Sequence, residues 1–245
     1  MGIINSYSLT DIGSRDENQD SFLMLRSKDE NALLAAIADG AGGADEGLTA
    51  SKGLLAEIGK WFAGLPNELW NEKSGKIMNE LDSKLKEIHE KMKAYASTKG
   101  ITFGTTLTLL IIIKEKSYLA AQVGDSRLYL YQDGALTQIT KDQTVAQKER
   151  DTGNEISCTG NKESTLLQCF GSGKVAPKYY DGTLKDEAEL LLCSDGLTNT
   201  LRFDEVEEAL KTYVLPFDTI DNLMRIARNR LEQDNITAII VKKGE

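Results

Sequence analysis

The stretch LLAAIADGAGGADEG, residues Leu33–Gly47, decides the fold of this chain. It begins with an apolar run, Leu33–Ala38, which Asp39 and a cluster of glycines follow at once. A short apolar run bounded by glycines is typical of a buried strand, and glycine permits the tight turn that ends it. We therefore predict a buried strand that stops at Asp39 and delivers its carboxylate to a turn.

Four further aspartates border apolar runs of strand character in the same way. They are Asp20 before SFLML, Asp125 between AAQV and RLYLY, Asp195 after ELLLCS, and Asp234 before NITAIIV. If these runs share one core, their ends can converge on one place. Five carboxylates repel one another, so they stay together only if cations neutralise them. The pattern predicts a carboxylate cluster that binds metal ions, with the rest of the chain as its scaffold.

Composition bounds the class of protein. The chain has 245 residues, of which 40% are hydrophobic, enough for a substantial core. Its net charge is −9, and no basic stripe is present to meet phosphates, so we expect no nucleic-acid partner. Three cysteines, an odd number, suggest no disulfide framework. We therefore expect a reducing compartment and a cytoplasmic location.

No membrane span or secretory signal is expected. The longest apolar run, Leu107–Ile113, is far shorter than the ~20 residues that a spanning helix needs. The first six residues, MGIINS, fit the N-myristoylation pattern. A first strand over Ile3–Leu9 is the better interpretation of this segment.

Hydrophobic periodicity divides the chain into strands and two blocks of paired helices. The helices are expected over about 46–63 and 74–96, and over about 204–211 and 218–231. Strands are expected at 3–9, 21–25, 33–38, 103–113, 118–123, 127–132, 136–139, 166–170, 178–180, 189–193 and 236–241. Because helices and strands do not alternate, we predict an α+β fold of mostly antiparallel sheets packed together, with helices outside. We expect one domain over residues 1–245, with an exposed polar flap at about 141–170.

The residue types favour hard cations. The only histidine is His89, so a zinc site built on imidazole is disfavoured, and no EF-hand spacing indicates calcium. Oxygen ligands suit Mg²⁺ or Mn²⁺. Two such ions held by carboxylates from separate strands can activate a water and screen an anionic ester. Arg15, in the turn before Asp20, can hold two phosphoryl oxygens with its planar guanidinium.

Other hydrolase chemistries lack the residues that they need. A cysteine-dependent phosphatase has an arginine six positions after its cysteine, and those positions hold Ser164, Val175 and Asn199. No glycine loop followed by Lys and Ser or Thr forms a P-loop. A serine hydrolase would have to use His89 as its base, whereas that ring flanks the apolar stripe of an expected helix.

Six motifs, in order, resemble those of the metal-dependent serine/threonine protein phosphatases of type 2C, in their compact bacterial form. They are SLTDIGSRDENQD, AIADGAGG, FGTTLTLL, QVGDSRLYLYQDGALTQITKDQT, LLCSDGLTNTL and QDNITAIIV. The resemblance covers nearly the whole chain. It implies a central antiparallel β-sandwich flanked by pairs of helices, a four-layer α-β-β-α arrangement.

The resemblance also implies a role for each site residue. Asp39 matches the aspartate that bridges two core metals, and the carbonyl of Gly40 matches a ligand of one of them. Asp195 and Asp234 match carboxylates of the other metal, and Asp125 with Asp195 matches the ligands of a weaker third. As catalytic residues, Asp20 matches the aspartate beside the metals and Arg15 the phosphate-binding arginine.

The implied activity is hydrolysis of phosphoserine and phosphothreonine in proteins, with two Mg²⁺ or Mn²⁺ ions and a metal-activated water. The implied partners are phosphorylated protein substrates and a cognate serine/threonine kinase, and we expect a monomer. The alternative is a binding module or adaptor with the same fold and impaired catalysis. Loss of core ligands would favour that alternative, and here only Gln19, in place of the usual Glu, departs among them.

Three further positions depart from the family pattern. Ala41 stands where animal members carry a histidine proposed as general acid. Gln143 replaces the usual His after Lys-Asp, and Asn199 stands where some relatives have a third-metal aspartate.

Overall fold

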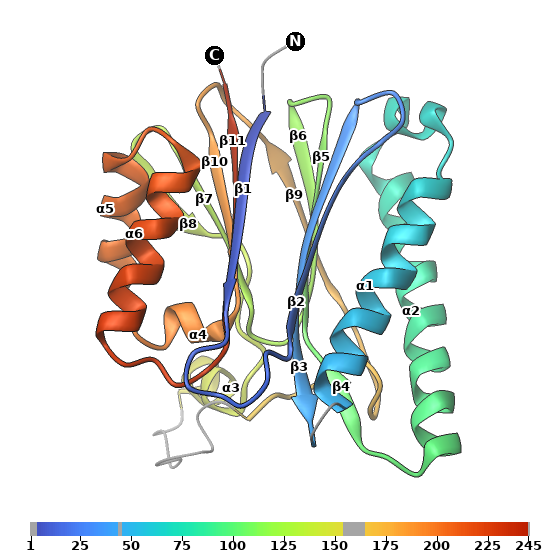
Figure 1. Cartoon of the computed structure of the whole chain (residues 1–245). Helices are drawn as coiled ribbons and strands as arrows, with labels where there is room; N and C mark the ends of the chain where they lie inside the picture. The colour runs from blue at the N-terminus through green and yellow to red at the C-terminus, as the bar shows by residue number, and fades with distance from the viewer. Residues whose placement is uncertain (1–3, 44–45, 154–164, 245) are drawn as a thin grey trace.

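Two antiparallel sheets pack face to face, and a pair of helices covers the outer face of each (Figure 1). The computed structural model describes residues 4–43, 46–153 and 165–244. The predicted α+β sandwich with flanking helix pairs is confirmed.

The five-stranded sheet has the order β1-β11-β10-β7-β8. Its strands are β1 (Ile4–Asp11), β11 (Ile236–Lys243), β10 (Glu189–Cys193), β7 (Arg127–Gln132) and β8 (Ala135–Gln138). The first and last strands of the chain are therefore neighbours in one sheet, which brings the opening loop next to the segment that precedes β11.

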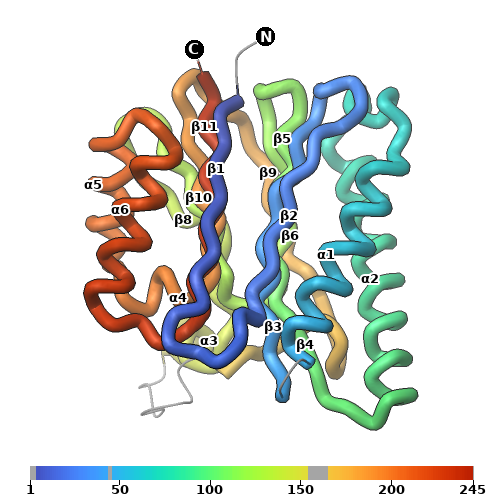
Figure 2. Tube along the Cα trace, in the orientation of Figure 1, coloured from blue at the N-terminus to red at the C-terminus, as the bar shows by residue number. Residues whose placement is uncertain are grey.

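The six-stranded sheet has the order β2-β3-β5-β6-β9, with β4 paired to the end of β3. Its strands are β2 (Asp20–Arg26), β3 (Ala32–Gly42), β5 (Leu107–Ile113), β6 (Ser117–Val123), β9 (Lys178–Thr183) and β4 (Phe103–Thr105). Figure 2 shows that β1 and β2, the edge strands of the two sheets, run along the same side of the sandwich.

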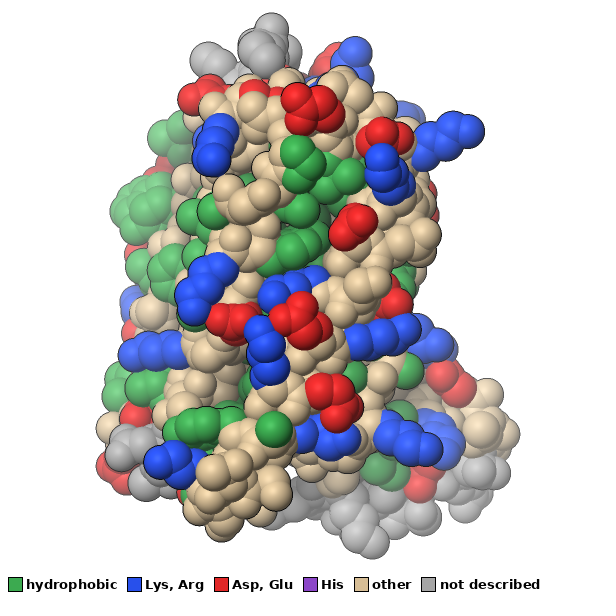
Figure 3. All heavy atoms as spheres, turned by 90° about the vertical axis from the view of Figure 1, so that its right-hand side faces the viewer, with side chains coloured by type: hydrophobic (Ala, Val, Ile, Leu, Met, Phe, Trp, Pro, Cys, Tyr) green, Lys and Arg blue, Asp and Glu red, His purple; other side chains and the backbone are tan. Residues whose placement is uncertain are grey.

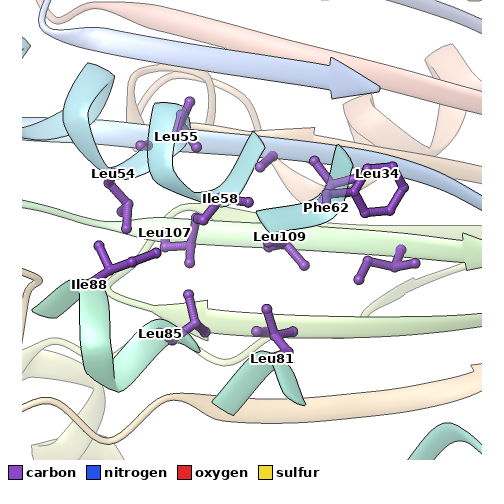
Figure 4. Packing of buried hydrophobic residues seen from close by; sticks show 14 of the residues in the cluster. Leu34, Leu54, Leu55, Ile58, Phe62, Leu81, Leu85, Ile88, Leu107 and Leu109 are labelled. Atoms are coloured by element: carbon purple, nitrogen blue, oxygen red, sulfur yellow. The ribbon is translucent and has the colours of Figure 1, made fainter. Parts of the chain in front are cut away.

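Helices α1 (Glu46–Gly64) and α2 (Ser74–Lys99) cover the six-stranded sheet, with η1 (Asn67–Asn71) between them. Side chains on the inner faces of both helices, such as Leu54, Ile58 and Leu85, meet Leu107 and Leu109 of β5 (Figure 4). The outer face of this layer carries charges of both signs (Figure 3), many in ion pairs such as Lys86–Asp82. This division between apolar and charged faces is what the helical periodicity predicted.

Helices α5 (Phe203–Thr212) and α6 (Pro216–Asn229) cover the five-stranded sheet. A third apolar cluster, which includes Ile37, Leu110, Leu192 and Ile239, fills the space between the two sheets. Three apolar layers thus separate four layers of secondary structure, so the sheets are fixed relative to each other and can build one site between them.

Two expected strands have other bounds in the structure. β3 does not stop at Asp39 but continues to Gly42, because its last residues find a second partner in β4. The expected strand over 103–113 is divided at Thr106, since β4 pairs with the end of β3 while β5 pairs with its centre. Asp39 therefore lies within a strand, with its backbone fixed on both sides.

The segment expected to be a flap contains a helix, α3 (Val145–Thr152), capped by the Thr144 hydroxyl. The expected strand over 166–170 makes only isolated bridges, such as Thr105 with Phe170. Residues 154–164 of the expected flap, including Cys158, lie outside the described residues, as do Met1–Ile3 of the myristoylation pattern. Among the helices that the structure does describe, none is both long enough and apolar enough to cross a membrane.

Candidate active site

Asp20, the first residue of β2, faces Asp39 across the β2–β3 pair. Strand β2 begins at the lower end of the sandwich in Figure 1. Directly opposed residues of antiparallel strands point to the same face of the sheet, about 5 Å apart at their Cβ atoms. Two like charges in this position destabilise a sheet unless something else compensates. The strand register, which spacing along the chain does not reveal, creates the first carboxylate pair of the site.

The other three carboxylates reach the same end from different turns. Asp125 lies in the turn between β6 and β7, and Asp195 begins a short helix, α4 (Asp195–Thr198), directly after β10. Asp234 precedes β11. Burial is the largest cause of a raised pKa at the Asp39 carboxyl. The negative charges of all four other aspartates raise this pKa further. The structure therefore brings together the five carboxylates that the sequence singled out.

The electrostatic cost of this cluster appears in its pKa values. Burial, then the charges of neighbouring aspartates, raises the pKa of Asp125 to about 7 and that of Asp195 above its ordinary value. Burial also raises the pKa of Asp20 to about 6, although hydrogen bonds from hydroxyl groups oppose the rise. Perturbed carboxylates gathered in this way are typical of a functional site.

A cleft of about 760 Å³ opens over the cluster. Asp39, Gly40 and Asp234 line it, together with Arg15, whose Nη2 donates to Asp234 Oδ2 at 2.8 Å. This bond, then the negative charge of Asp234, raises the pKa of the Arg15 guanidinium. Arg15 is well exposed, so it lies at the mouth of the cleft where an anionic substrate would enter.

The residues present fit divalent cations. Two carboxylate oxygens at the site, Asp20 Oδ1 and Asp195 Oδ1, are buried and have no hydrogen-bond partner among the described residues. Buried polar atoms normally have a partner, so these oxygens are available to a cation. In residues 4–43, 46–153 and 165–244, no three His, Cys, Asp or Glu side chains close around a single point. An ion here would take its remaining ligands from the Gly40 carbonyl and from water, as Mg²⁺ commonly does.

Close backbone packing makes glycine necessary at the end of β3. A Cβ atom at Gly40 would overlap the carbonyl oxygen of Gly47 in the first turn of α1. A Cβ at Gly47 would in turn overlap the side-chain amide of Gln19. The three backbones therefore meet at the wall of the cleft, which fixes the position of the Gly40 carbonyl.

Several residues that sequence reasoning missed hold these groups in place. The Asp39 backbone N–H donates to Thr106 Oγ1 at 3.0 Å, and Thr105 Oγ1 donates to the Asp39 carbonyl at 2.9 Å. Asn235 accepts from the Gln19 N–H and donates to the carbonyls of Ile12 and Glu17, which ties the opening loop to β11. The sequence could have indicated these residues, because each lies next to one of the five aspartates or within one of the six motifs.

The departures from the family pattern also have structural settings. Gln19 donates to Glu17 Oε2 at 3.2 Å, and both residues line the cleft with Ala41. Asn199 is exposed, and its hydrogen bond to Asp195 opposes the rise in the pKa of that carboxyl. Gln143 is buried below the Gly124–Asp125 turn.

The fold is that of the protein phosphatases. The family model described as Protein phosphatase 2C matches residues 10–237. The chain therefore belongs to the protein phosphatase 2C family, and it is a protein phosphatase.

Individual relatives agree along almost the whole length. A serine/threonine phosphatase, stp, of Listeria welshimeri is 30% identical over 240 residues, which cover 94% of this chain and 92% of the relative. The crystal structure of the serine/threonine phosphatase Stp1 of Staphylococcus aureus superposes with a TM-score of 0.88 at 28% identity, covering 99% of this chain and 96% of that one. The catalytic domain of the serine/threonine protein phosphatase PstP, in complex with two manganese ions, gives a TM-score of 0.84 at 26% identity, with 100% of both chains covered.

Proposed function

We propose that this phosphatase removes phosphate from phosphoserine and phosphothreonine in proteins at a centre of two Mg²⁺ or Mn²⁺ ions. The names of the three relatives described above, each a serine/threonine phosphatase, and the two manganese ions of the PstP structure support this proposal. Asp39, the Gly40 carbonyl, Asp195 and Asp234 would hold the ions, with Asp20 beside them. Asp125 and Asp195 would hold a weaker third ion.

One observation carries the proposal: five aspartates from both sheets converge beneath a cleft whose mouth holds an arginine. When bound, the two ions would supply an activated water and would offset charge on the phosphate ester. The aspartates would fix the place of the ions, because each lies in a strand or within two residues of one. Their mutual repulsion makes binding of divalent cations strongly favourable.

Arg15 would hold the phosphoryl group. Its guanidinium can bind two oxygens of a phosphate at once, and it reaches the cleft from the loop between β1 and β2. The carboxylate of Asp234 keeps the side chain over the cleft in the structure described here. The Arg15 guanidinium could then bind an incoming phosphate as a second anion, beside the carboxylate of Asp234.

The wider setting follows from this chemistry. We propose that the chain acts as one catalytic domain, in the cytoplasm and as a monomer, on proteins phosphorylated by a cognate serine/threonine kinase. The adaptor alternative is not favoured, because the singled-out carboxylates are all present and the other four lie close enough to raise the pKa of Asp39. Gln19 is the one departure among the expected ligands.

Metal-titrated hydrolysis of p-nitrophenyl phosphate and of a phosphothreonine peptide tests the proposal. We expect turnover that depends on Mn²⁺ or Mg²⁺ and a loss of at least ~100-fold in Asp39→Asn, since the metals contribute several kcal/mol to the barrier. Asp133→Asn is the matched control, because Asp133-Gly134 is the same dipeptide in the β7–β8 hairpin, away from the cleft. Turnover without added metal after chelation, or full activity of Asp39→Asn, would refute the proposal.

A further inference from the structure

The two carboxylate oxygens of Asp20 have different surroundings. Oδ2 accepts a hydrogen bond of 2.8 Å from the Ser194 hydroxyl. Oδ1 has no hydrogen-bond partner among the described residues, although the side chain is only 6% exposed. One oxygen is therefore held by the protein, and the other is buried and open to a ligand.

Ser194 is held on both sides by β11. Its backbone N–H donates to the Thr237 carbonyl at 2.9 Å, and its Oγ accepts from the Thr237 N–H at 2.9 Å. Since a hydroxyl has one proton, and Oγ already accepts from a backbone donor, that proton is committed to Asp20. The fully buried Ser194 is thus a fixed donor.

This hydrogen bond joins the two sheets at the site. Asp20 begins β2 in the six-stranded sheet, whereas Ser194 follows β10 in the five-stranded sheet. Ser194 also directly precedes Asp195, the other aspartate with a buried oxygen left without a hydrogen bond in the described part of the chain. The Ser194 hydroxyl therefore connects Asp20 directly to the residue that precedes Asp195.

We propose that Ser194 is a positioning residue for the metal centre: its hydroxyl holds Asp20 Oδ2 and so leaves Oδ1 available to a divalent cation or its bound water. This inference rests on the proposed function. A charge-assisted hydrogen bond fixes the rotamer of Asp20 before the ion binds. Metal binding then does not lose free energy in ordering this side chain. Without the bond, Asp20 would also be free to turn away from Asp39, which faces it across the strand pair.

The experiment measures Mn²⁺ binding to the metal-free protein by isothermal titration calorimetry, without substrate. We expect Ser194→Ala to weaken binding by about 10–100-fold, the usual loss when the partner of a ligand is removed. Thr219→Val is the matched control. Thr219 is fully buried, and its Oγ1 donates to the Leu215 carbonyl at 3.3 Å at the start of α6, so this change removes a buried hydroxyl hydrogen bond that does not involve the aspartates. We expect Thr219→Val to keep the affinity of the unaltered protein.

A merely structural hydrogen bond between the sheets would give another result. In that case Ser194→Ala would lower the midpoint of urea unfolding in chelator but would bind Mn²⁺ as tightly as the unaltered protein, and the inference would be overturned. An equal loss of affinity in Thr219→Val would also overturn it. If Ser194→Ala does not fold, Ser194→Cys replaces it, because a thiol is a weak donor and Mn²⁺ prefers oxygen ligands. Unchanged affinity in Ser194→Cys would overturn the inference as well.

The same measurements distinguish failure of the proposed function from failure of the inference about Ser194. If neither the unaltered protein nor Thr219→Val binds Mn²⁺, the metal centre itself is wrong. If the unaltered protein binds Mn²⁺, Asp39→Asn does not, and Ser194→Ala binds normally, the metal centre stands and only the role of Ser194 is refuted.

Discussion

At the scale of single residues, the sequence marks charged groups better than the neutral groups that orient them. Aspartates that border apolar runs are conspicuous, because a carboxylate there must either reach solvent or find a partner. Hydroxyl groups such as those of Thr106 and Ser194 fit a strand as well as any small residue does. Their roles appear only when the strands are placed side by side.

Arg15 supplies the first prediction at this scale. Arg15→Ala should raise KM and lower kcat/KM for a phosphothreonine peptide by about 10–100-fold, because hydrogen bonds to a charged group contribute ~1.5–3 kcal/mol. Arg15→Lys should be intermediate, since an ammonium group cannot bind two oxygens in one plane. Steady-state kinetics at saturating Mn²⁺ measure the effect. Arg202→Ala, an exposed arginine paired with Asp204 on α5, serves as control and should leave KM unchanged.

At the scale of elements, helix ends and strand pairing explain where expectation and structure agree or differ. The helix expected to end near residue 96 ends at Lys99, and Gly100 follows in the left-handed conformation with φ of 67°. The end of β3 was wrongly expected to be a turn, because a run of glycines also permits a strand to pass close to another backbone. The sequence analysis predicts only the turn, whereas the structure shows the close approach of Gly40 to Gly47.

Two glycines make a paired test of helix chemistry. Gly100→Ala should destabilise the protein by about 1–2 kcal/mol, the cost of a left-handed conformation for a residue with a Cβ atom. Gly53→Ala, inside α1, should stabilise it by about 0.5–1 kcal/mol, because a Cβ there meets no described atom within 4 Å and glycine is a poor helix former. Urea unfolding of both variants measures the opposite signs. Shifts of equal sign would contradict this explanation.

The base of the expected flap gives a further test. Gln143 Oε1 accepts from the Gly124 N–H at 3.0 Å and from Gln168 Nε2 at 2.6 Å, while its Nε2 donates to the Gln122 carbonyl at 3.2 Å. Its backbone carbonyl also accepts from the Leu167 N–H at 2.8 Å. An amide makes these bonds with no charge, so Gln143 joins the flap to the turn of Asp125 at any pH.

We expect Gln143→Ala to destabilise the protein by about 1–3 kcal/mol, because the Gly124 N–H is left buried without its acceptor. Faster hydrogen exchange at the Gly124 amide should accompany the loss. Gln147→Ala is the control, since Gln147 bonds Asp151 on the exposed side of α3. If the Gly124 amide exchanges no faster in Gln143→Ala than in the control, Gln143 does not hold this turn.

At the scale of the whole molecule, stability and activity oppose each other at one end of the sandwich. Three apolar clusters stabilise the four layers, whereas five carboxylates at the lower end repel one another. Bound divalent cations would turn that repulsion into attraction. The fold therefore provides a rigid frame for a cluster that is unfavourable without its ions.

Metal binding should consequently stabilise the entire fold. At 100 times its dissociation constant, each ion adds ~2.7 kcal/mol, which raises the Tm of a chain of this size by several degrees. Asp39→Asn should lose most of this gain, yet its metal-free form should melt higher than the unaltered metal-free protein, because one repelling charge is gone. Thermal unfolding with and without Mn²⁺ measures both effects. A metal-free Asp39→Asn that melts lower would contradict the electrostatic account.

The sequence by itself determined the α+β class, the two helix pairs and the five aspartates of the candidate site, because periodicity and residue type are local properties of the chain. Tertiary structure alone decided that Asp20 faces Asp39, that β3 continues past the aspartate, and that Ser194 bonds Asp20 across the two sheets. These features depend on strand register and on contacts between residues as many as 174 positions apart. No local pattern encodes them, since they arise only when the two sheets pack and their ends meet.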